Sequence, residues 1–291
     1  MATAGQWLEG ARPRTLPAAI APVAVGAGLA ANVDALMPAR VLLALVVAVA
    51  LQVGVNYAND YSDGIKGTDA VRVGPVRLVG QQLATPRSVK AAALGSFAVA
   101  ALGGLVLVGL TAQWWLLLVG AASIAAAWLY TGGPRPYGYA GLGEVFVFVF
   151  FGVVPVVGTA YVQTLVITAV DVVASVGVGL LACAILVTNN LRDIGGDSAV
   201  GKRTLAVRIG DRRTRLLYAA MVVAALAVPL VLALMTSPWV ALASATAALA
   251  VRPLRVVLGG ALGPGLIPAL KLTGVLLLVY GLVLGLLLGL A

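Results

Sequence analysis

The sequence predicts an all-α protein that crosses a membrane several times, and two observations support this prediction. Of its 291 residues, 62% are hydrophobic and 10% are charged, and the mean hydropathy is +1.07. A soluble domain, in which about 25% of residues are normally charged, would lack the polar surface to cover such a core. The apolar runs are also continuous and about as long as a membrane-spanning helix, whereas strands of a membrane barrel would alternate apolar and polar residues.

Stretches without charged residues mark nine predicted spans. They are 15–33, 41–59, two helices within 91–134 with a turn near 111–113, 145–170, 172–191, two helices within 216–251 broken at 236–238, and 272–291. The eighth span, about 238–251, is the shortest. Glycine and proline are frequent in 256–270, so this segment is expected to be a loop or a re-entrant piece.

The distribution of basic residues predicts the orientation. Of the 19 Lys and Arg residues, all but Arg40 fall on the side of the N-terminal tail and of the loops after even-numbered spans. Cytoplasmic loops carry such an excess, so the N-terminus is expected in the cytoplasm and the C-terminus outside. The same rule explains the net charge of +9 without a nucleic-acid partner. The protein is therefore expected in the cell membrane, with its polar groups facing the cytoplasm.

Two counts exclude whole classes of chemistry. The chain has no histidine, which excludes an imidazole base and a histidine-ligated metal. Its single cysteine, Cys183, lies in an apolar run and is expected to be a buried apolar side chain. The N-terminus shows no apolar core followed by small residues, so no cleaved signal peptide is expected.

A first polar cluster ends the second predicted span. Asn56 and Asp60 are four residues apart and Asp60 and Asp63 are three apart, so on a helix they share one face, and Lys66 follows. Carboxylates at the end of a membrane helix are costly unless they are paired, hydrated or bound to metal. Two of them beside an amide provide the oxygen ligands that Mg²⁺ prefers.

A second cluster of the same kind ends the sixth predicted span. Asn189, Asp193 and Asp197 are spaced four and four, and Lys202 and Arg203 come soon after. Carboxylates that hold Mg²⁺ beside basic side chains are suited to bind a diphosphate. A single acidic helix end could be a solvated surface feature, but two equivalent ends favour a binding site.

The equivalent positions of the clusters predict the organisation of the chain. We expect one integral-membrane domain, 1–291, with similar halves at about 15–135 and 140–255 and a ninth helix at about 272–291 outside the pseudo-symmetry. Membrane proteins built from repeated halves commonly place their site between them.

The predicted turn between the fourth and fifth spans, 130–144, is rich in Gly, Pro and Tyr. Its tyrosines could form part of an interfacial aromatic belt. Glu144 begins a membrane helix and needs a partner, for which Arg135 is a candidate. Both are also candidates for contact with substrate.

These motifs resemble those of the UbiA superfamily of intramembrane aromatic prenyltransferases, which has nine helices and aspartate-rich motifs on helices 2 and 6. Within it, the chain is most similar to the 1,4-dihydroxy-2-naphthoate polyprenyltransferases of menaquinone biosynthesis. The resemblance rests on 11–17, 59–69 with 74–77, 130–144 and 189–204. The third aspartate of the first motif often lies four residues after the second. Here that position is Gly67 and the next acid is Asp69, so the resemblance leaves open whether Asp69 binds metal.

The resemblance implies an enzyme that transfers a polyprenyl group from its diphosphate to 1,4-dihydroxy-2-naphthoate, with loss of the carboxyl group. It implies metal binding, through two Mg²⁺ ions, by Asp60, Asp63, Asp193 and Asp197, with Asn56 and Asn189 orienting them or completing the coordination. It implies diphosphate binding by Lys66, Arg77, Lys202 and Arg203. For the acceptor, Arg135 is expected to bind the carboxylate, and Tyr139 or Glu144 to assist proton movement. The apolar bundle would hold the prenyl tail.

Three alternatives remain open at this stage. The acceptor could be another aromatic compound or a sugar phosphate within the same superfamily. A phospholipid-synthesis phosphotransferase also uses intramembrane aspartates, but its acidic residues lie in one contiguous segment. A cation-coupled transporter is disfavoured because the acids lie at helix ends and no charge lies at mid-membrane depth. The prenyl length and the oligomeric state do not follow from the sequence.

Overall fold

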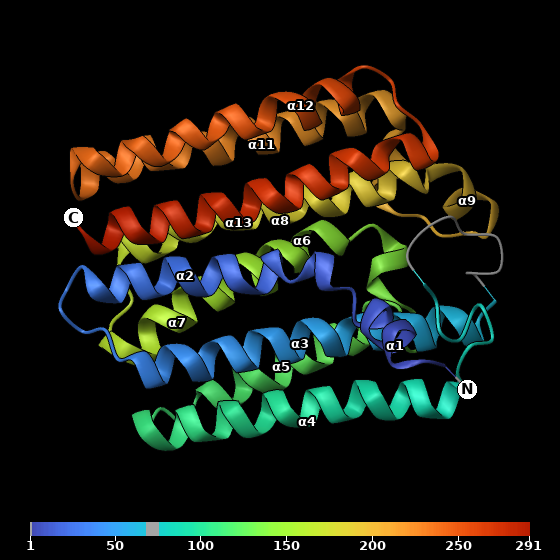
Figure 1. Cartoon of the computed structure of the whole chain (residues 1–291), viewed down its shortest axis with the longest axis horizontal. Helices are drawn as coiled ribbons and strands as arrows, with labels where there is room; N and C mark the ends of the chain where they lie inside the picture. The colour runs from blue at the N-terminus through green and yellow to red at the C-terminus, as the bar shows by residue number, and fades with distance from the viewer. Residues whose placement is uncertain (1, 68–75) are drawn as a thin grey trace.

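The computed structural model describes residues 2–67 and 76–291, and within them every regular element is helical. Figure 1 shows long helices lying side by side along one direction, with the C-terminus at one end of the bundle and the N-terminus near the other. The predicted all-α class is therefore confirmed for the described part of the chain.

The helices are joined by connections of unequal length. In chain order they are α1 (Ala4–Ala11), η1 (Pro13–Thr15), α2 (Pro17–Ala31), α3 (Pro38–Ile65), α4 (Pro86–Thr111), α5 (Leu116–Leu129), η2 (Tyr137–Ala140), α6 (Gly143–Val147), η3 (Phe148–Val153), α7 (Val154–Thr164), α8 (Ala169–Arg192), α9 (Ile194–Ala199), α10 (Leu205–Ile209), α11 (Asp211–Met235), η4 (Pro238–Thr246), α12 (Ala247–Leu258), η5 (Gly263–Leu266) and α13 (Ile267–Gly289).

Among the described residues, seven helices are long and apolar enough to cross a membrane. They are Pro38–Ile65, Pro86–Thr111, Gly143–Thr164, Ala169–Arg192, Asp211–Met235, Pro238–Leu258 and Gly263–Gly289. An eighth would be the pair Ala4–Thr15 and Pro17–Ala31, which is bent by 49°. The fourth predicted span corresponds to α5, an apolar helix of 14 residues, shorter than the roughly 20 residues of a typical span. A multi-pass membrane protein is thus supported, and the count of nine stays a prediction.

The prediction of a loop or re-entrant piece at 256–270 is wrong. α12 continues to Leu258, and after the short turn at 259–262 the next helical segment begins at Gly263. The prolines at the start of η5 and of α13 lie in the first turn of each helix, where a missing N–H removes no hydrogen bond. Proline therefore marks helix starts here, and the last two helices are longer than predicted.

α2 and α13 pack at very close range. A Cβ atom added at Gly28 would overlap the backbone of Gly285, and one added at Gly281 would overlap Ala21. Small residues allow membrane helices to approach in this way. The largest buried apolar cluster, which includes Val25, Leu181 and Leu284, joins these two helices to α8 and α11. This closely packed side of the bundle supports one wall of the cavity described below.

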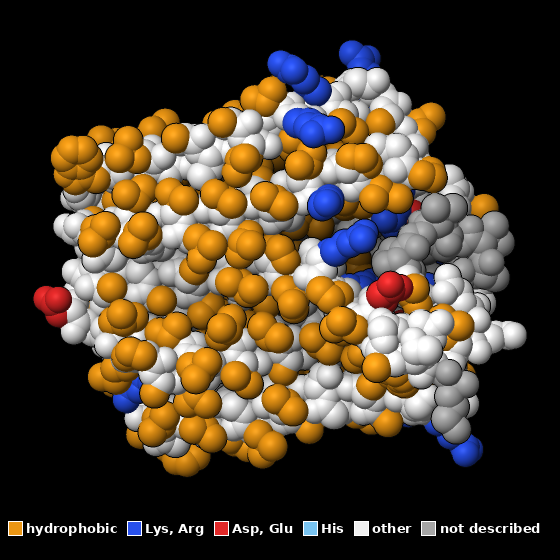
Figure 2. Space-filling model, in the orientation of Figure 1, with side chains coloured by type: hydrophobic (Ala, Val, Ile, Leu, Met, Phe, Trp, Pro, Cys, Tyr) orange, Lys and Arg blue, Asp and Glu red, His pale blue; other side chains and the backbone are white. Residues whose placement is uncertain are grey.

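The surface separates an apolar flank from a charged end. Figure 2 shows hydrophobic side chains spread over the flank of the bundle, while Lys and Arg gather mainly toward the end at which Figure 1 places α1 and α9. At the opposite end, Arg40 donates hydrogen bonds to the carbonyls of Val162 and Leu110, at the ends of α7 and α4. The single basic residue predicted on that side thus has structural partners.

Candidate active site

A cavity of about 990 Å³ lies within the bundle, and α2, α3, α4, α5, α8, α13 and the α6–α7 segment line it. Its walls are mostly apolar along its length. The charged lining residues are Glu9, Arg12, Arg14, Asp63, Arg77, Arg192, Asp197, Lys202 and Lys271. The cavity therefore combines an apolar chamber with a charged region, the shape expected for a ligand with a lipid chain and an anionic head.

The structure brings the two predicted clusters together at this cavity. Asn56 and Asp63 reach it from α3, and Asn189 and Asp197 reach it from α8 and α9. Lys202 Nζ lies 3.3 Å from Asp63 Oδ1 and so connects the second cluster directly to the first. Both of these side chains are largely shielded from solvent, which strengthens their attraction.

Tyr139 lies between the two lysines of the clusters. Its hydroxyl donates a hydrogen bond to Asp63 Oδ1. Lys202 Nζ and Lys66 Nζ lie 4.5 and 5.2 Å from the centre of its ring, within the range of cation–π attraction. Tyr139, predicted from the 130–144 turn as a site residue, is therefore part of the charged wall of the cavity.

Lys66 also ties the end of α3 to this turn. Its ammonium group donates hydrogen bonds to the carbonyls of Thr131 at 2.6 Å and Gly133 at 3.3 Å. Partial burial lowers the pKa of Lys66, Asp63 raises it, and Lys202 lowers it. The net direction is downward, so this lysine loses its charge more readily than a free one.

Asp60 and Asp193 have other partners and do not line the cavity. Asp60 is fully buried and accepts hydrogen bonds from the backbone N–H groups of Leu78 and Val79, at 2.7 and 3.1 Å. Asp193 accepts two hydrogen bonds from the adjacent Arg192, both at 2.7 Å. To act as metal ligands, as predicted, these carboxylate oxygens would have to coordinate the ion in addition to accepting these hydrogen bonds.

Four other predicted residues also lie off the cavity wall: Lys66, which holds the 130–144 turn, and Arg135, Arg203 and Glu144. Arg135 and Arg203 are exposed. Glu144 is buried behind the wall, where its Oε1 accepts a hydrogen bond of 3.0 Å from Asn190 Nδ2, and Asn190 lines the cavity. The sequence had suggested Arg135 as the partner of Glu144. In the structure, the partner is instead the amide of Asn190. Arg77 does line the cavity, whereas Asp69 lies outside the described residues.

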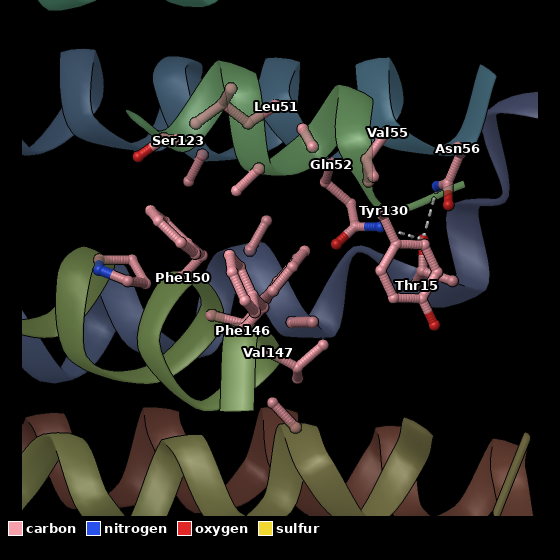
Figure 3. A pocket seen from close by; sticks show the side chains of 18 of the residues that line it. Thr15, Leu51, Gln52, Val55, Asn56, Ser123, Tyr130, Phe146, Val147 and Phe150 are labelled. Atoms are coloured by element: carbon pink, nitrogen blue, oxygen red, sulfur yellow. Dashed lines mark hydrogen bonds between the residues drawn. The ribbon is translucent and has the colours of Figure 1, made fainter. Parts of the chain in front are cut away.

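Sequence reasoning missed a network around Thr15. The Thr15 hydroxyl donates to the carbonyl of Arg12 at 2.8 Å and accepts from Asn56 Nδ2 at 2.9 Å and Gln52 Nε2 at 3.0 Å. Figure 3 shows both amide nitrogens turned toward Thr15. Gln52 lies one helical turn before Asn56 within an apolar run, and a polar residue at that depth is itself a signal of function.

An aromatic group forms another part of the wall. The rings of Tyr137 and Phe146 are stacked with centres 3.9 Å apart, Tyr130 meets Tyr137 edge-on at 5.5 Å, and Phe150 stacks on Phe146 at 6.0 Å. All four line the cavity. Burial raises the pKa of Tyr137, whose hydroxyl donates to the carbonyl of Ala126, so this ring is neutral. The faces of the four rings can stabilise a nearby cation or stack on an aromatic ligand.

The carboxylates of the described residues do not form a ready-made metal cage. No group of three or more Asp, Glu or Cys residues there is arranged to hold an ion. Mg²⁺, however, is usually bound by one or two carboxylates together with substrate phosphates. Asp63 and Asp197, each with a cavity-lining asparagine, fit an ion that binds together with a phosphorylated ligand.

Comparison with known proteins gives the family of this chain. The model of the UbiA prenyltransferase family matches residues 19–258. The chain belongs to this family. A 1,4-dihydroxy-2-naphthoate octaprenyltransferase of Mycobacterium tuberculosis is 56% identical over 97% of this chain and 96% of its own length. The protein of the same name from Escherichia coli is 41% identical over 76% of this chain and 73% of its own.

Solved structures agree on the fold of the family. A UbiA homologue from Archaeoglobus fulgidus, bound to DMAPP and Mg²⁺, aligns with a TM-score of 0.67 at 15% identity over 96% of this chain and 99% of its own. A UbiA homologue from Aeropyrum pernix also aligns with a TM-score of 0.67, at 16% identity over 90% of this chain and 95% of its own. The bundle described above is thus the UbiA fold.

Proposed function

We propose that this protein is a Mg²⁺-dependent enzyme that transfers a polyprenyl group from its diphosphate to 1,4-dihydroxy-2-naphthoate, with decarboxylation, to give the demethylmenaquinone skeleton. The observation that supports this most is the convergence of Asp63, Asp197 and Lys202 on a largely apolar cavity. The choice of 1,4-dihydroxy-2-naphthoate as the acceptor rests on the high identity to naphthoate prenyltransferases over nearly the whole chain.

The charged region would bind the diphosphate. Asp63 and Asp197, with Asn56 and Asn189, would hold Mg²⁺, which neutralises the anion and assists its departure. Asp60 and Asp193 remain predicted ligands of Mg²⁺. We also propose that the site binds two Mg²⁺ ions. Lys202 and Arg77 place positive charge on the same region, and Lys66 lies beside it, 5.2 Å from the centre of the Tyr139 ring. The exposed Arg203 would have to turn inward to join them.

Departure of the diphosphate leaves an allylic cation. The rings of Tyr130, Tyr137 and Phe146 would stabilise it through their faces. The π electrons of the electron-rich acceptor ring then form the new carbon–carbon bond, and loss of CO₂ returns an electron pair to the ring. No strong nucleophile is needed from the protein, in keeping with a chain without histidine.

The remaining walls would hold the prenyl tail and the acceptor. Small and apolar residues of α4 and α5, among them Ala101, Gly104, Leu117 and Gly120, line the chamber away from the charges. Tyr139 is well placed to contact the acceptor, whereas Arg135 and Glu144 would need to move to reach it. The protein would lie in the cell membrane with the charged end of the bundle facing the cytoplasm, because the basic residues gather at that end.

The test is prenyl transfer by the detergent-solubilised protein, with 1,4-dihydroxy-2-naphthoate and a polyprenyl diphosphate, in Mg²⁺ or EDTA. We expect a Mg²⁺-dependent, decarboxylated product, and a loss of turnover of about 10²-fold or more in Asp63→Asn and Asp197→Asn. The matched control is Asp34→Asn, an exposed residue in the turn between α2 and α3 that should leave turnover unchanged.

Two outcomes would contradict the proposal. Product formed with hydroxybenzoate and not with the naphthoate would keep the mechanism and change the acceptor. No transfer to any phenol by folded protein would overturn the enzymatic function and favour transport, to be tested in sealed vesicles.

A further inference from the structure

We infer that Gln52 binds a ring hydroxyl of the aromatic acceptor through its side-chain oxygen and so contributes to acceptor specificity; this inference rests on the proposed function. Gln52 lies on α3 and lines the cavity, and only 5% of its surface is exposed. Its Oε1 is buried and has no hydrogen-bond partner among the described residues. A buried acceptor without a donor is costly and is rare in native structures, which points to a ligand that supplies the donor.

The orientation of this amide is determined by its neighbours. The Thr15 hydroxyl has one proton, which it donates to the carbonyl of Arg12. It can therefore only accept from the amides that face it, so both Gln52 and Asn56 must present their NH₂ groups to it. Their oxygens consequently point away from Thr15, and Figure 3 shows the Gln52 oxygen directed into the cavity toward Phe146.

The depth of Gln52 suits the acceptor ring. Asn56 is four residues further along α3 and borders the charged region with Asp63. Four residues of α-helix separate the two amides by about 6 Å along the axis. A group bound by Asn56 would be the diphosphate with its metal, so Gln52 lies beside the carbon from which the diphosphate departs. The acceptor ring must approach that same carbon.

The chemistry also favours a hydroxyl as the partner. An amide oxygen accepts a hydrogen bond but does not take up the proton at neutral pH. As the acceptor ring gives electrons to the allylic cation, its hydroxyl becomes a stronger donor, and the hydrogen bond to Gln52 strengthens. Val55 and Phe146, which line the cavity with Gln52, are apolar and offer no competing acceptor.

The experiment measures equilibrium binding of naphthoates to the purified full chain in detergent, with Mg²⁺ and inorganic diphosphate but no prenyl donor. The ligands are 1,4-dihydroxy-2-naphthoate and the two monohydroxy-2-naphthoates, each of which lacks one hydroxyl without added bulk. For the wild type we expect one monohydroxy compound to bind about tenfold more weakly than the dihydroxy compound, the size of one hydrogen bond.

The decisive variant is Gln52→Met, which keeps the length of the side chain and removes its oxygen acceptor. It should bind the dihydroxy compound about tenfold more weakly and no longer distinguish it from that monohydroxy compound. Gln113→Met makes the same change outside the cavity, where Gln113 accepts a hydrogen bond from Tyr161, and should keep the wild-type discrimination. Thermal unfolding of Gln52→Met should change only modestly, because the variant loses the hydrogen bond from Nε2 to Thr15 but also removes an unpaired buried oxygen.

Unchanged discrimination in Gln52→Met would overturn this inference while leaving the proposed function intact. If the wild type binds none of the naphthoates although it binds a polyprenyl diphosphate, the proposed acceptor is wrong and this inference fails with it. Strong destabilisation of Gln52→Met with discrimination retained would show that Gln52 is structural.

Discussion

Asp60 and Asp63 lie less than one helical turn apart, yet their surroundings differ. Both oxygens of Asp60 receive backbone N–H groups from residues 78 and 79, which anchors the chain after the first motif against α3. Asp63 faces the cavity and contacts Tyr139 and Lys202. Spacing alone placed both on one helix face and could not separate these environments, because the partners come from residues 18 to 139 positions away.

Lys66 provides a prediction of pH dependence. Its pKa is lowered, mainly by partial burial, so it loses its positive charge at a lower pH than a free lysine. As pH rises through this lowered pKa, neutralisation of the departing diphosphate weakens and the rate falls. Arginine stays charged throughout, so Lys66→Arg should move the alkaline limb of kcat/KM for the prenyl diphosphate to higher pH.

The measurement is the pH profile of prenyl transfer for the wild type, Lys66→Arg and Lys90→Arg. Lys90 is exposed near the start of α4 and lies over the ring of Tyr61, so its replacement should leave the profile unchanged. Coincident profiles for the wild type and Lys66→Arg would show that another group sets the alkaline limb.

At the scale of elements, the long apolar runs predicted most helices, whereas irregular helices were not predictable from periodicity. The segment Gly143–Thr164 changes from α to π geometry at Phe148–Val153. Pro155 follows at the start of α7 and cannot donate the next backbone hydrogen bond, which loosens the preceding turn. The same segment carries Phe146 and Phe150 on the cavity wall, so the irregular element helps to shape the site.

The close packing of α2 on α13 gives a prediction of stability. A methyl group at Gly28 would overlap the backbone of Gly285, so the two helices must separate to accept it. Gly28→Ala should therefore destabilise the fold by about 1–3 kcal/mol, measured as a lower midpoint of thermal unfolding in detergent. At Gly109 of α4 nothing lies within 4 Å of the new methyl group, and Gly109→Ala should be neutral or slightly stabilising. An equal effect of both variants would contradict the packing argument.

At the scale of the whole molecule, the sequence predicted that the ends of two helices form a shared site, but not the side-chain contacts within it. The equivalent acidic ends of α3 and α8 predicted a shared site, and Asn56, Asp63, Asn189, Asp197 and Lys202 do line one cavity. The places of Gln52, Asn190 and the aromatic wall depend on contacts between distant segments, which no local pattern contains. The similar halves at 15–135 and 140–255 stay a prediction.

The basic side chains bear on how the protein lies in the membrane. The gathering of Lys and Arg at one end predicts that this end, with the N-terminus, faces the cytoplasm. Because Cys183 is the only cysteine and is buried, Cys183→Ala gives a background for introducing Ala2→Cys or Ala291→Cys. A membrane-impermeant maleimide should label position 291 in intact cells and position 2 only after permeabilisation. Labelling of position 2 in intact cells would show the opposite orientation. The diphosphate site would then face away from a cytoplasmic substrate.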